Sequence, residues 1–161
     1  MVSITHFTIS IIWLFLGLTQ AAPRPKRSEF LGAVRCHEIF ENSCYYFSDY
    51  ALNWYEAQVS CLSHNSMLAE IETRSEAEFL QIKAKLYGGD WWLGGRDDVV
   101  EGQWRWFSTG LPFSTFDWTS GEPNNGGNDQ DCLRIWQLSY HWDDFHCSEK
   151  QKFICEAKGS F

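Results

Sequence analysis

The sequence "SGEPNNGGNDQDC", residues 120–132, gathers carboxylate and amide side chains, three glycines and one proline ahead of a cysteine. Gly, Pro, Asn and Asp favour turns, because glycine adopts left-handed backbone angles and the short polar side chains bond their own backbone. The segment is therefore predicted to be a loop. A solvated surface loop would account for the polarity alone. Its side chains, however, are rich in oxygen and poor in positive charge, which is the composition that a hard cation such as Ca²⁺ selects.

The composition of the whole chain is that of a single folded domain. The chain has 161 residues, of which 44% are hydrophobic and 17% are aromatic, enough for one core and a short extra segment. The formal net charge of -8 disfavours nucleic acid and anionic membrane surfaces as partners, since both are bound mainly through Lys and Arg. A cation is the more natural ligand.

The N-terminal residues have the pattern of a targeting segment. An apolar run over residues 9–18 precedes Ala21 and Ala22, so residues 1–21 are predicted to be a secretory signal peptide. The run is too short to span a membrane, and no second run follows, so membrane insertion is not expected. Residues 22–33 are predicted to be a linker or a short propeptide, since RPKRS resembles a dibasic processing site. The expected location is secreted and extracellular, with the domain over residues 34–158.

The six cysteines are expected to form disulfide bonds if the chain is secreted. An even count in an oxidising compartment predicts disulfides. Spacing alone leaves many pairings open, and zinc is disfavoured because no C-x₂-C or C-x₄-C pair occurs. A bridge between Cys132 and Cys147 would close a loop of about fifteen residues, worth roughly 3 kcal/mol in the chain-entropy model, and would brace the loop. The six cysteines are Cys36, Cys44, Cys61, Cys132, Cys147 and Cys155.

Two helices are predicted in the first half of the chain. Asn53 is a suitable N-cap for the first, which has apolar positions at Trp54, Ala57, Val59 and Cys61. The second covers residues 72–86. Its expected apolar face is Phe79, Leu80, Ile82 and Leu86, and its expected solvated face is Arg74, Glu76, Lys83 and Lys85.

Strands are predicted in the second half. Short aromatic and β-branched runs bounded by turn residues occupy residues 91–95, 102–107, 132–138 and 152–157. Two helices followed by strands and a long loop indicate an α+β fold. The tryptophans expected in the core are Trp91, Trp92, Trp104, Trp106, Trp136 and Trp142.

The order of these motifs resembles a C-type lectin domain of the long form, over residues 34–157. The motifs are WYEAQVSC, LAEIETRSEAEFL, WWLGG in the place of the family's W-I-G-L, EGQWRW, EPN and WDDFHC. The resemblance implies the C-type lectin fold, with two helices, small antiparallel sheets and a long calcium-binding loop. It also implies three disulfides, Cys36–Cys44, Cys61–Cys155 and Cys132–Cys147.

In this family, side chains that coordinate Ca²⁺ also bond two neighbouring hydroxyls of a sugar ring, with carboxylates accepting and amides donating. Ca²⁺ takes six to eight oxygen ligands, which leaves positions for such hydroxyls. Pro123 is expected to be the family's cis-proline, since an X-Pro bond is the one place where a cis bond is cheap. The residues that the resemblance assigns to both the ion and the sugar are Glu122, Asn124, Gln130, Asp143 and Asp144.

Two of these positions depart from the family pattern. Gln130 stands where Glu is usual, and Asp143 stands where Asn is usual. Because the two changes compensate, three carboxylates remain and Ca²⁺ binding is expected to survive. EPN implies mannose, fucose or glucose-like glycans. Gln130 and Asp143 exchange the donor and the acceptor that would face the second sugar hydroxyl. A buried donor that faces another donor costs about 1–3 kcal/mol, which is enough to change the preferred sugar, so galactose stays an alternative.

A second ion is expected beside the first. The positions that match the family's auxiliary calcium site come from two loops, and an ion there would hold the long loop in its binding shape. A surface carboxylate cluster is the alternative interpretation. The four matching residues are Asp97, Glu101, Asn125 and Asp131.

The resulting prediction is a secreted calcium-dependent lectin that recognises cell-surface or microbial glycans, for innate pattern recognition or agglutination. A glycosidase is disfavoured, since carboxylates around Ca²⁺ stay ionised and are not poised as acids. An acidic calcium-binding matrix or biomineral-associated protein is the alternative. No heptad or collagen-like segment precedes Cys36, so the sequence does not support an oligomer.

Overall fold

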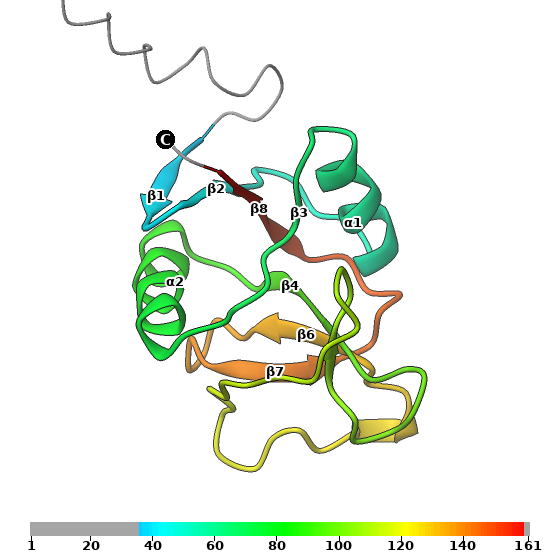
Figure 1. Cartoon of the computed structure of the whole chain (residues 1–161). Helices are drawn as coiled ribbons and strands as arrows, with labels where there is room; N and C mark the ends of the chain where they lie inside the picture. The colour runs from blue at the N-terminus through cyan, green and yellow to red at the C-terminus, as the bar shows by residue number, and fades with distance from the viewer. Residues whose placement is uncertain (1–35, 160–161) are drawn as a thin grey trace, which may run out of the picture.

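The computed structural model describes residues 36–159, in which two helices flank an eight-stranded sheet (Figure 1). The predicted signal peptide, residues 1–21, and the whole of the predicted linker, residues 22–33, lie outside the described residues. None of the described helices is long and apolar enough to cross a membrane. The elements are β1 (Glu38–Phe40), β2 (Ser43–Phe47), α1 (Trp54–Leu62), β3 (Met67–Leu68), α2 (Arg74–Tyr87), β4 (Trp91–Arg96), β5 (Arg105–Trp106), η1 (Gly126–Asn128), β6 (Cys132–Ile135), β7 (Trp142–Phe145) and β8 (Lys152–Lys158).

The strands run in the order β1-β2-β8-β4-β6-β7, with β3 paired to β8 and β5 paired to β4. The pairing of β4 with β8 is parallel and the others are antiparallel. The long loop between β5 and β6, yellow in Figure 1, lies beyond the β6–β7 edge of this sheet. The α+β prediction is confirmed, and the sheet edge next to the loop is where the site residues of β7 meet the loop.

Side-chain caps explain where the helices begin. The Oδ1 atom of Asn53 accepts a bond from the backbone N–H of Glu56 at 2.9 Å, and the Glu56 carboxylate accepts one from the backbone of Asn53. This capping box satisfies two donors that the first turn leaves unpaired. At the start of α2, the Thr73 hydroxyl oxygen accepts a hydrogen bond from the backbone N–H of Glu76. The predicted N-cap at Asn53 is therefore confirmed.

The predicted faces of both helices need correction. Val59, Ile82 and Leu86 are 65%, 64% and 71% exposed, so none of them packs in the core. The buried face of α2 consists of Ala77, Leu80 and Ala84 with Glu76 at its start, and Phe79 packs at its margin. Glu76, expected in solvent, is buried because it accepts a hydrogen bond from the Tyr45 hydroxyl at 2.5 Å.

Two of the four predicted strands are shorter than expected, whereas β4 and β8 each extend one residue beyond the predicted end. The run at 102–107 forms only Arg105–Trp106, and the run at 132–138 ends at Ile135. Strand β7 was not predicted, because WDDF carries two adjacent carboxylates that strands usually avoid. In β4, Gly95 lies against the Phe113 ring, and a Cβ there would lie 2.3 Å from Cζ of Phe113, so a larger residue would force the ring to move.

The core is largely aromatic, as predicted. Trp91, Trp92, Trp104, Trp106 and Trp142 are each at most 7% exposed. Trp136 is only half-buried, because it follows the end of β6, and its predicted place in the core is wrong.

The three disulfides follow the implied pairing. Cys36–Cys44 closes the β1–β2 hairpin, Cys61–Cys155 joins α1 to β8, and Cys132–Cys147 joins the start of β6 to the residues after β7. The third bridge holds together the two segments that contribute site residues.

Candidate functional site

Three carboxylates meet at the β7 edge of the sheet. Asp143 and Asp144 come from β7 and Glu122 comes from the long loop, and each offers an oxygen within 4.8 Å of the others. The Glu122–Pro123 peptide bond is cis, as predicted. Asp143 and Asp144 are 6% and 1% exposed, so the cluster concentrates negative charge where water screens it poorly. A cation is the species that such a cluster accommodates.

The carboxylate of Asp144 fixes the loop against the strand. Its Oδ1 accepts the backbone N–H of Asn124 at 3.1 Å, and its Oδ2 accepts that of Asn125 at 2.6 Å. The side-chain amide of Asn124 donates to Oε1 of Glu122 at 2.8 Å. Glu122 and Asn124, on either side of the cis-proline, therefore lie together above β7.

Glu122 shows the electrostatic cost of this arrangement. Several causes together raise its pKa to about 7: burial is the largest, the nearby carboxylates of Asp144 and Asp143 add to it, and the bond from Asn124 opposes them. Its Oε2 atom is buried and has no hydrogen-bond partner in the described part of the chain. Unpaired buried oxygens are costly, and coordination to a cation would satisfy this one.

Gln130 lies within the long loop, and both its side chain and its backbone form hydrogen bonds to earlier residues of the same loop. Its side-chain Oε1 accepts the backbone N–H of Gly126, and its own backbone N–H donates to Oδ1 of Asn125 at 3.1 Å. The carboxylate cluster and Gln130 are thus linked through Asn125 rather than by a direct bond. Gln130 shapes the loop that carries Glu122 and Asn124.

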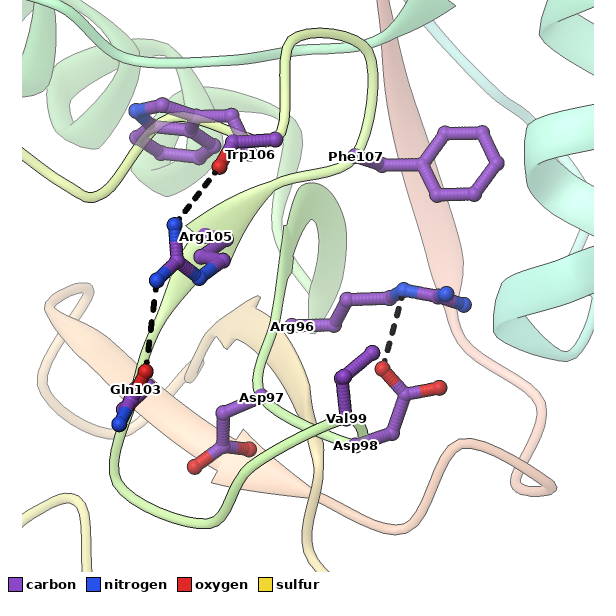
Figure 2. Close-up of a pocket in the computed structure, with 9 residues that line it drawn as sticks. Arg96, Asp97, Asp98, Val99, Gln103, Arg105, Trp106 and Phe107 are labelled. Atoms are coloured by element: carbon purple, nitrogen blue, oxygen red, sulfur yellow. Dashed lines mark hydrogen bonds and ion pairs between the residues drawn. The ribbon is translucent and has the colours of Figure 1, made fainter.

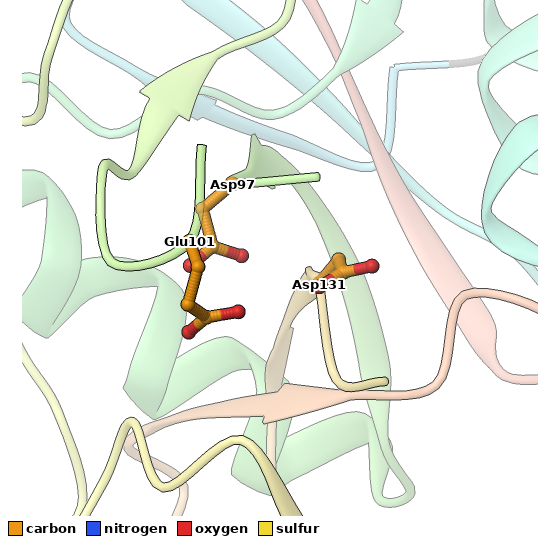
Figure 3. Close-up of side chains that lie close together, drawn as sticks. All are labelled: Asp97, Glu101 and Asp131. Atoms are coloured by element: carbon orange, nitrogen blue, oxygen red, sulfur yellow. The ribbon is translucent and has the colours of Figure 1, made fainter. Parts of the chain in front are cut away.

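A second carboxylate cluster lies beside the first. Figure 3 shows Asp97 and Glu101, from the loop after β4, beside Asp131 just before β6, and their ligand oxygens lie within 4.8 Å of one another. The pKa of Asp97 is raised to about 6, mainly by burial; a bond from the Gly102 N–H opposes the rise, and the charges of Glu101, Asp131 and Asp144 add to it. The Oδ1 atom of Asp97 is buried without a partner among the described residues. This cluster is a second candidate for a cation.

Asn125 connects the two clusters. Its backbone N–H donates to Asp144, and its side-chain amide donates to Oε2 of Glu101 at 2.5 Å. Its φ of 45° is left-handed, a conformation that asparagine tolerates better than most residues. The structure thus brings together Asp97, Glu101, Asn125 and Asp131, the residues matched to the auxiliary site.

Arg134 was missed by sequence reasoning. It lies on β6 directly opposite Asp143 in the β6–β7 register. Its Nε and Nη2 atoms both lie 2.7 Å from Oδ2 of Asp143. Burial raises the pKa of Asp143 and the bond from Arg134 lowers it, so the net rise is moderated by this pair. The signal in the sequence was the aspartate itself, since a buried charge needs a partner.

A pocket of about 160 Å³ next to Asp97 has a different character (Figure 2). Its two arginines already have partners, Arg96 with Asp98 at 3.1 Å and Arg105 with the carbonyl of Gly110 at 3.0 Å. The arginines of the pocket therefore offer little free positive charge for a ligand, and Asp97, which also lines it, belongs to the second carboxylate cluster.

Comparison with known proteins identifies the family. Residues 50–157 match the family model described as the lectin C-type domain. The chain belongs to the C-type lectin family. It is 33% identical over 120 residues to hepatic lectin of Gallus gallus, covering 74% of this chain and 56% of that protein. It is 37% identical over 112 residues to ladderlectin of Oncorhynchus mykiss, covering 67% and 58%. The chain thus spans a little over half of these two relatives.

Solved structures agree with this assignment. The carbohydrate-recognition domain of the mouse scavenger receptor C-type lectin matches with a TM-score of 0.71 and 29% identity, covering 77% of this chain and 94% of that one. The same domain of cow CD23, determined in the presence of a GlcNAc2Man3 oligosaccharide, matches with a TM-score of 0.68 and 28% identity, covering 76% and 92%. The described residues are a C-type lectin carbohydrate-recognition domain of disulfide-rich, extracellular type, and the family is non-enzymatic.

Proposed function

We propose that this chain is a secreted, calcium-dependent lectin that binds mannose-type glycans on cell or microbial surfaces. The observation that carries the proposal is the cluster of Glu122, Asp143 and Asp144, which is built from the cis-proline loop and β7. Within residues 36–159, one buried oxygen of Glu122 has no hydrogen-bond partner. The ion would be held by Glu122, Asn124, Gln130, Asp143 and Asp144.

The charge of the cluster supports Ca²⁺ as its ion. Ca²⁺ prefers carboxylate and amide oxygens and tolerates irregular geometry, which suits side chains drawn from a loop and a strand. The second cluster would hold an auxiliary ion and keep the loop in place through Asn125. When bound, Ca²⁺ would supply open coordination positions for sugar hydroxyls.

Hydrogen bonding around the site supports a sugar with two neighbouring equatorial hydroxyls. The amide of Asn124 is a donor and the carboxylate of Glu122 is an acceptor, and the two lie side by side. Mannose, fucose and glucose-like rings are the expected ligands, because EPN is the family motif for them. Galactose is the second candidate because of Gln130 and Asp143. One structural relative supports this by analogy, since the cow CD23 domain was determined in the presence of a mannose-containing oligosaccharide.

The experiment is retention of the full, disulfide-bonded chain on mannose and galactose resins in Ca²⁺. Retention on mannose, with release by EDTA and by free mannose, is the expected result. An E122Q/N124D chain, which carries the galactose-type QPD motif, is the matched control and should shift toward galactose. Retention of the wild type on galactose alone would overturn the sugar preference. Ca²⁺ binding in calorimetry without retention on either resin would favour the acidic matrix or biomineral alternative, for which the net charge of -8 is the supporting observation.

A further inference from the structure

Asp143 presents a problem that the proposed site must solve. A carboxylate can offer Ca²⁺ two oxygens, whereas the asparagine implied at this position by the family pattern offers one. Asp143 is 6% exposed and lies close to the carboxylates of Glu122 and Asp144. If both of its own oxygens were free, Asp143 would add negative charge to the cluster and a second ligand atom to the ion. Arg134, on the neighbouring strand β6, counters both the extra charge and the extra oxygen.

Arg134 occupies one oxygen of Asp143. The two residues are direct partners across β6 and β7, and both nearby guanidinium nitrogens lie 2.7 Å from the same atom, Oδ2. Hydrogen bonds of this length between two charged groups are among the strongest in proteins. In the described part of the chain no hydrogen-bond donor reaches Oδ1, so that atom is left for the carboxylate cluster.

The guanidinium is itself held firmly. Its side chain is 8% exposed, and its central carbon lies 3.5 Å from the centre of the Phe145 ring. Asp90 lies 4.0 Å from Nη1, on the side away from the Asp143 contact. A planar guanidinium packed on an aromatic face keeps its donors in a fixed plane, which a lysine ammonium cannot do.

We propose that Arg134 is a positioning residue that makes Asp143 act toward the cation as an asparagine would, by presenting one oxygen only. This inference rests on the proposed function. Three carboxylates and one guanidinium give the primary cluster a net charge of -2, which matches Ca²⁺. Holding Oδ2 also keeps a coordination position open for a sugar hydroxyl, which a two-oxygen carboxylate would take.

The test compares R134M, D143N and the double variant with the wild-type chain, by calorimetry for Ca²⁺ and, at saturating Ca²⁺, for mannose. In R134M we expect Ca²⁺ affinity to rise about tenfold, because a positive charge is removed and both Asp143 oxygens become free. Mannose affinity at saturating Ca²⁺ is expected to fall about tenfold. Adding D143N to R134M restores the net charge of -2 and should return both affinities to within about threefold of wild type.

Two controls separate positioning from bracing of the fold. K83M removes a cation that pairs with Glu38 at 2.9 Å outside the site, and should change neither affinity. R134K keeps the positive charge but lacks the planar guanidinium. Ca²⁺ affinity should therefore stay within about threefold of wild type, while mannose affinity should fall by about threefold. R134K also decides the question if R134M does not fold. Urea unfolding in EDTA reports the structural effect of each variant separately.

The outcomes distinguish this inference from the proposed function. If R134M lowers the urea midpoint but leaves both affinities within twofold, or if it weakens Ca²⁺ binding, the positioning role is overturned. If the wild type binds Ca²⁺ but no sugar, the proposed function fails in its sugar part and the Ca²⁺ measurements alone decide the inference. If the wild type binds no Ca²⁺, both are overturned.

Discussion

The side-chain amide of Asn125 donates a hydrogen bond to Glu101 at 2.5 Å, and this bond joins the long loop to the loop that follows β4. The backbone of the same asparagine donates to Asp144 on β7. One residue therefore touches both carboxylate clusters. A change in either cluster should reach the other through Asn125, and the two proposed ions are expected to bind cooperatively.

Replacing Asn125 by alanine tests this link. N125A loses the bonds to Glu101 and Gln130, so we expect Ca²⁺ affinity at the auxiliary cluster to fall about tenfold and mannose affinity to fall about threefold. Calorimetric titration measures both. N128A is a matched control, since Asn128 is an exposed loop asparagine with a left-handed φ of 59°. Equal behaviour of the two variants would contradict the proposed link.

Replacing Glu122 by glutamine should affect the apo and the calcium-loaded protein in opposite ways. Without metal, E122Q relieves repulsion from Asp143 and Asp144, so the urea midpoint in EDTA should not fall. With metal, the loss of one charged ligand should weaken Ca²⁺ binding by about thirtyfold. Paired urea and calorimetry measurements check both signs. A fall in the EDTA midpoint, or unchanged Ca²⁺ affinity, would count against Glu122 as a ligand.

Local chemistry made much of the scaffold predictable from the sequence. The cap at Asn53 depends on residues three positions apart, and the disulfide pairing followed from the family pattern of motifs. The faces of the helices depended instead on what lies opposite them. Apolar residues occur all around α2, so periodicity alone did not reveal that Leu80 faces the sheet and Ile82 faces solvent.

The site was predictable only where its residues carry their own signature. The loop from Glu122 to Gln130 is unusual in composition, and the family pattern supplied the remaining candidates. Arg134 has no such signature, because it lies in an ordinary strand and meets Asp143 only through the β6–β7 register. Register across strands is a long-range property that short motifs do not contain.

Two substitutions on α2 test the corrected helix face. L80A removes a side chain that is 0% exposed and should lower the free energy of unfolding by about 2–5 kcal/mol. I82K changes a side chain that is 64% exposed and should alter it by no more than about 0.5 kcal/mol. Urea unfolding in saturating Ca²⁺ measures both. A large loss in I82K would mean that Ile82 contacts another surface in solution.

Glu156 should make the stability of the metal-free protein depend on pH. This carboxyl is 1% exposed and accepts bonds from the Ser43 hydroxyl at 2.6 Å and the Glu70 N–H at 3.2 Å. Its pKa is raised from 4.5 to about 7 as the net result of burial, the largest cause, and the charge of Glu76, with the bonds from Ser43 and Glu70 and the charge of Lys158 opposing them. The folded state therefore binds more protons than the unfolded state between these values, and stability falls as pH rises through that window, by at most about 3 kcal/mol.

The measurement is urea unfolding in EDTA at pH 5 and pH 7.5 for the wild type, E156Q and E149Q. Glu122 and Asp97 change stability in the same direction, so the quantity of interest is the difference between wild type and E156Q. E156Q should lose the Glu156 share of the pH dependence and be the more stable of the two at pH 7.5. E149Q, an exposed control, should keep the wild-type slope. If E156Q also kept the full slope, the buried carboxyl would be ionised across the whole range, stabilised by its hydrogen bonds against the cost of burial.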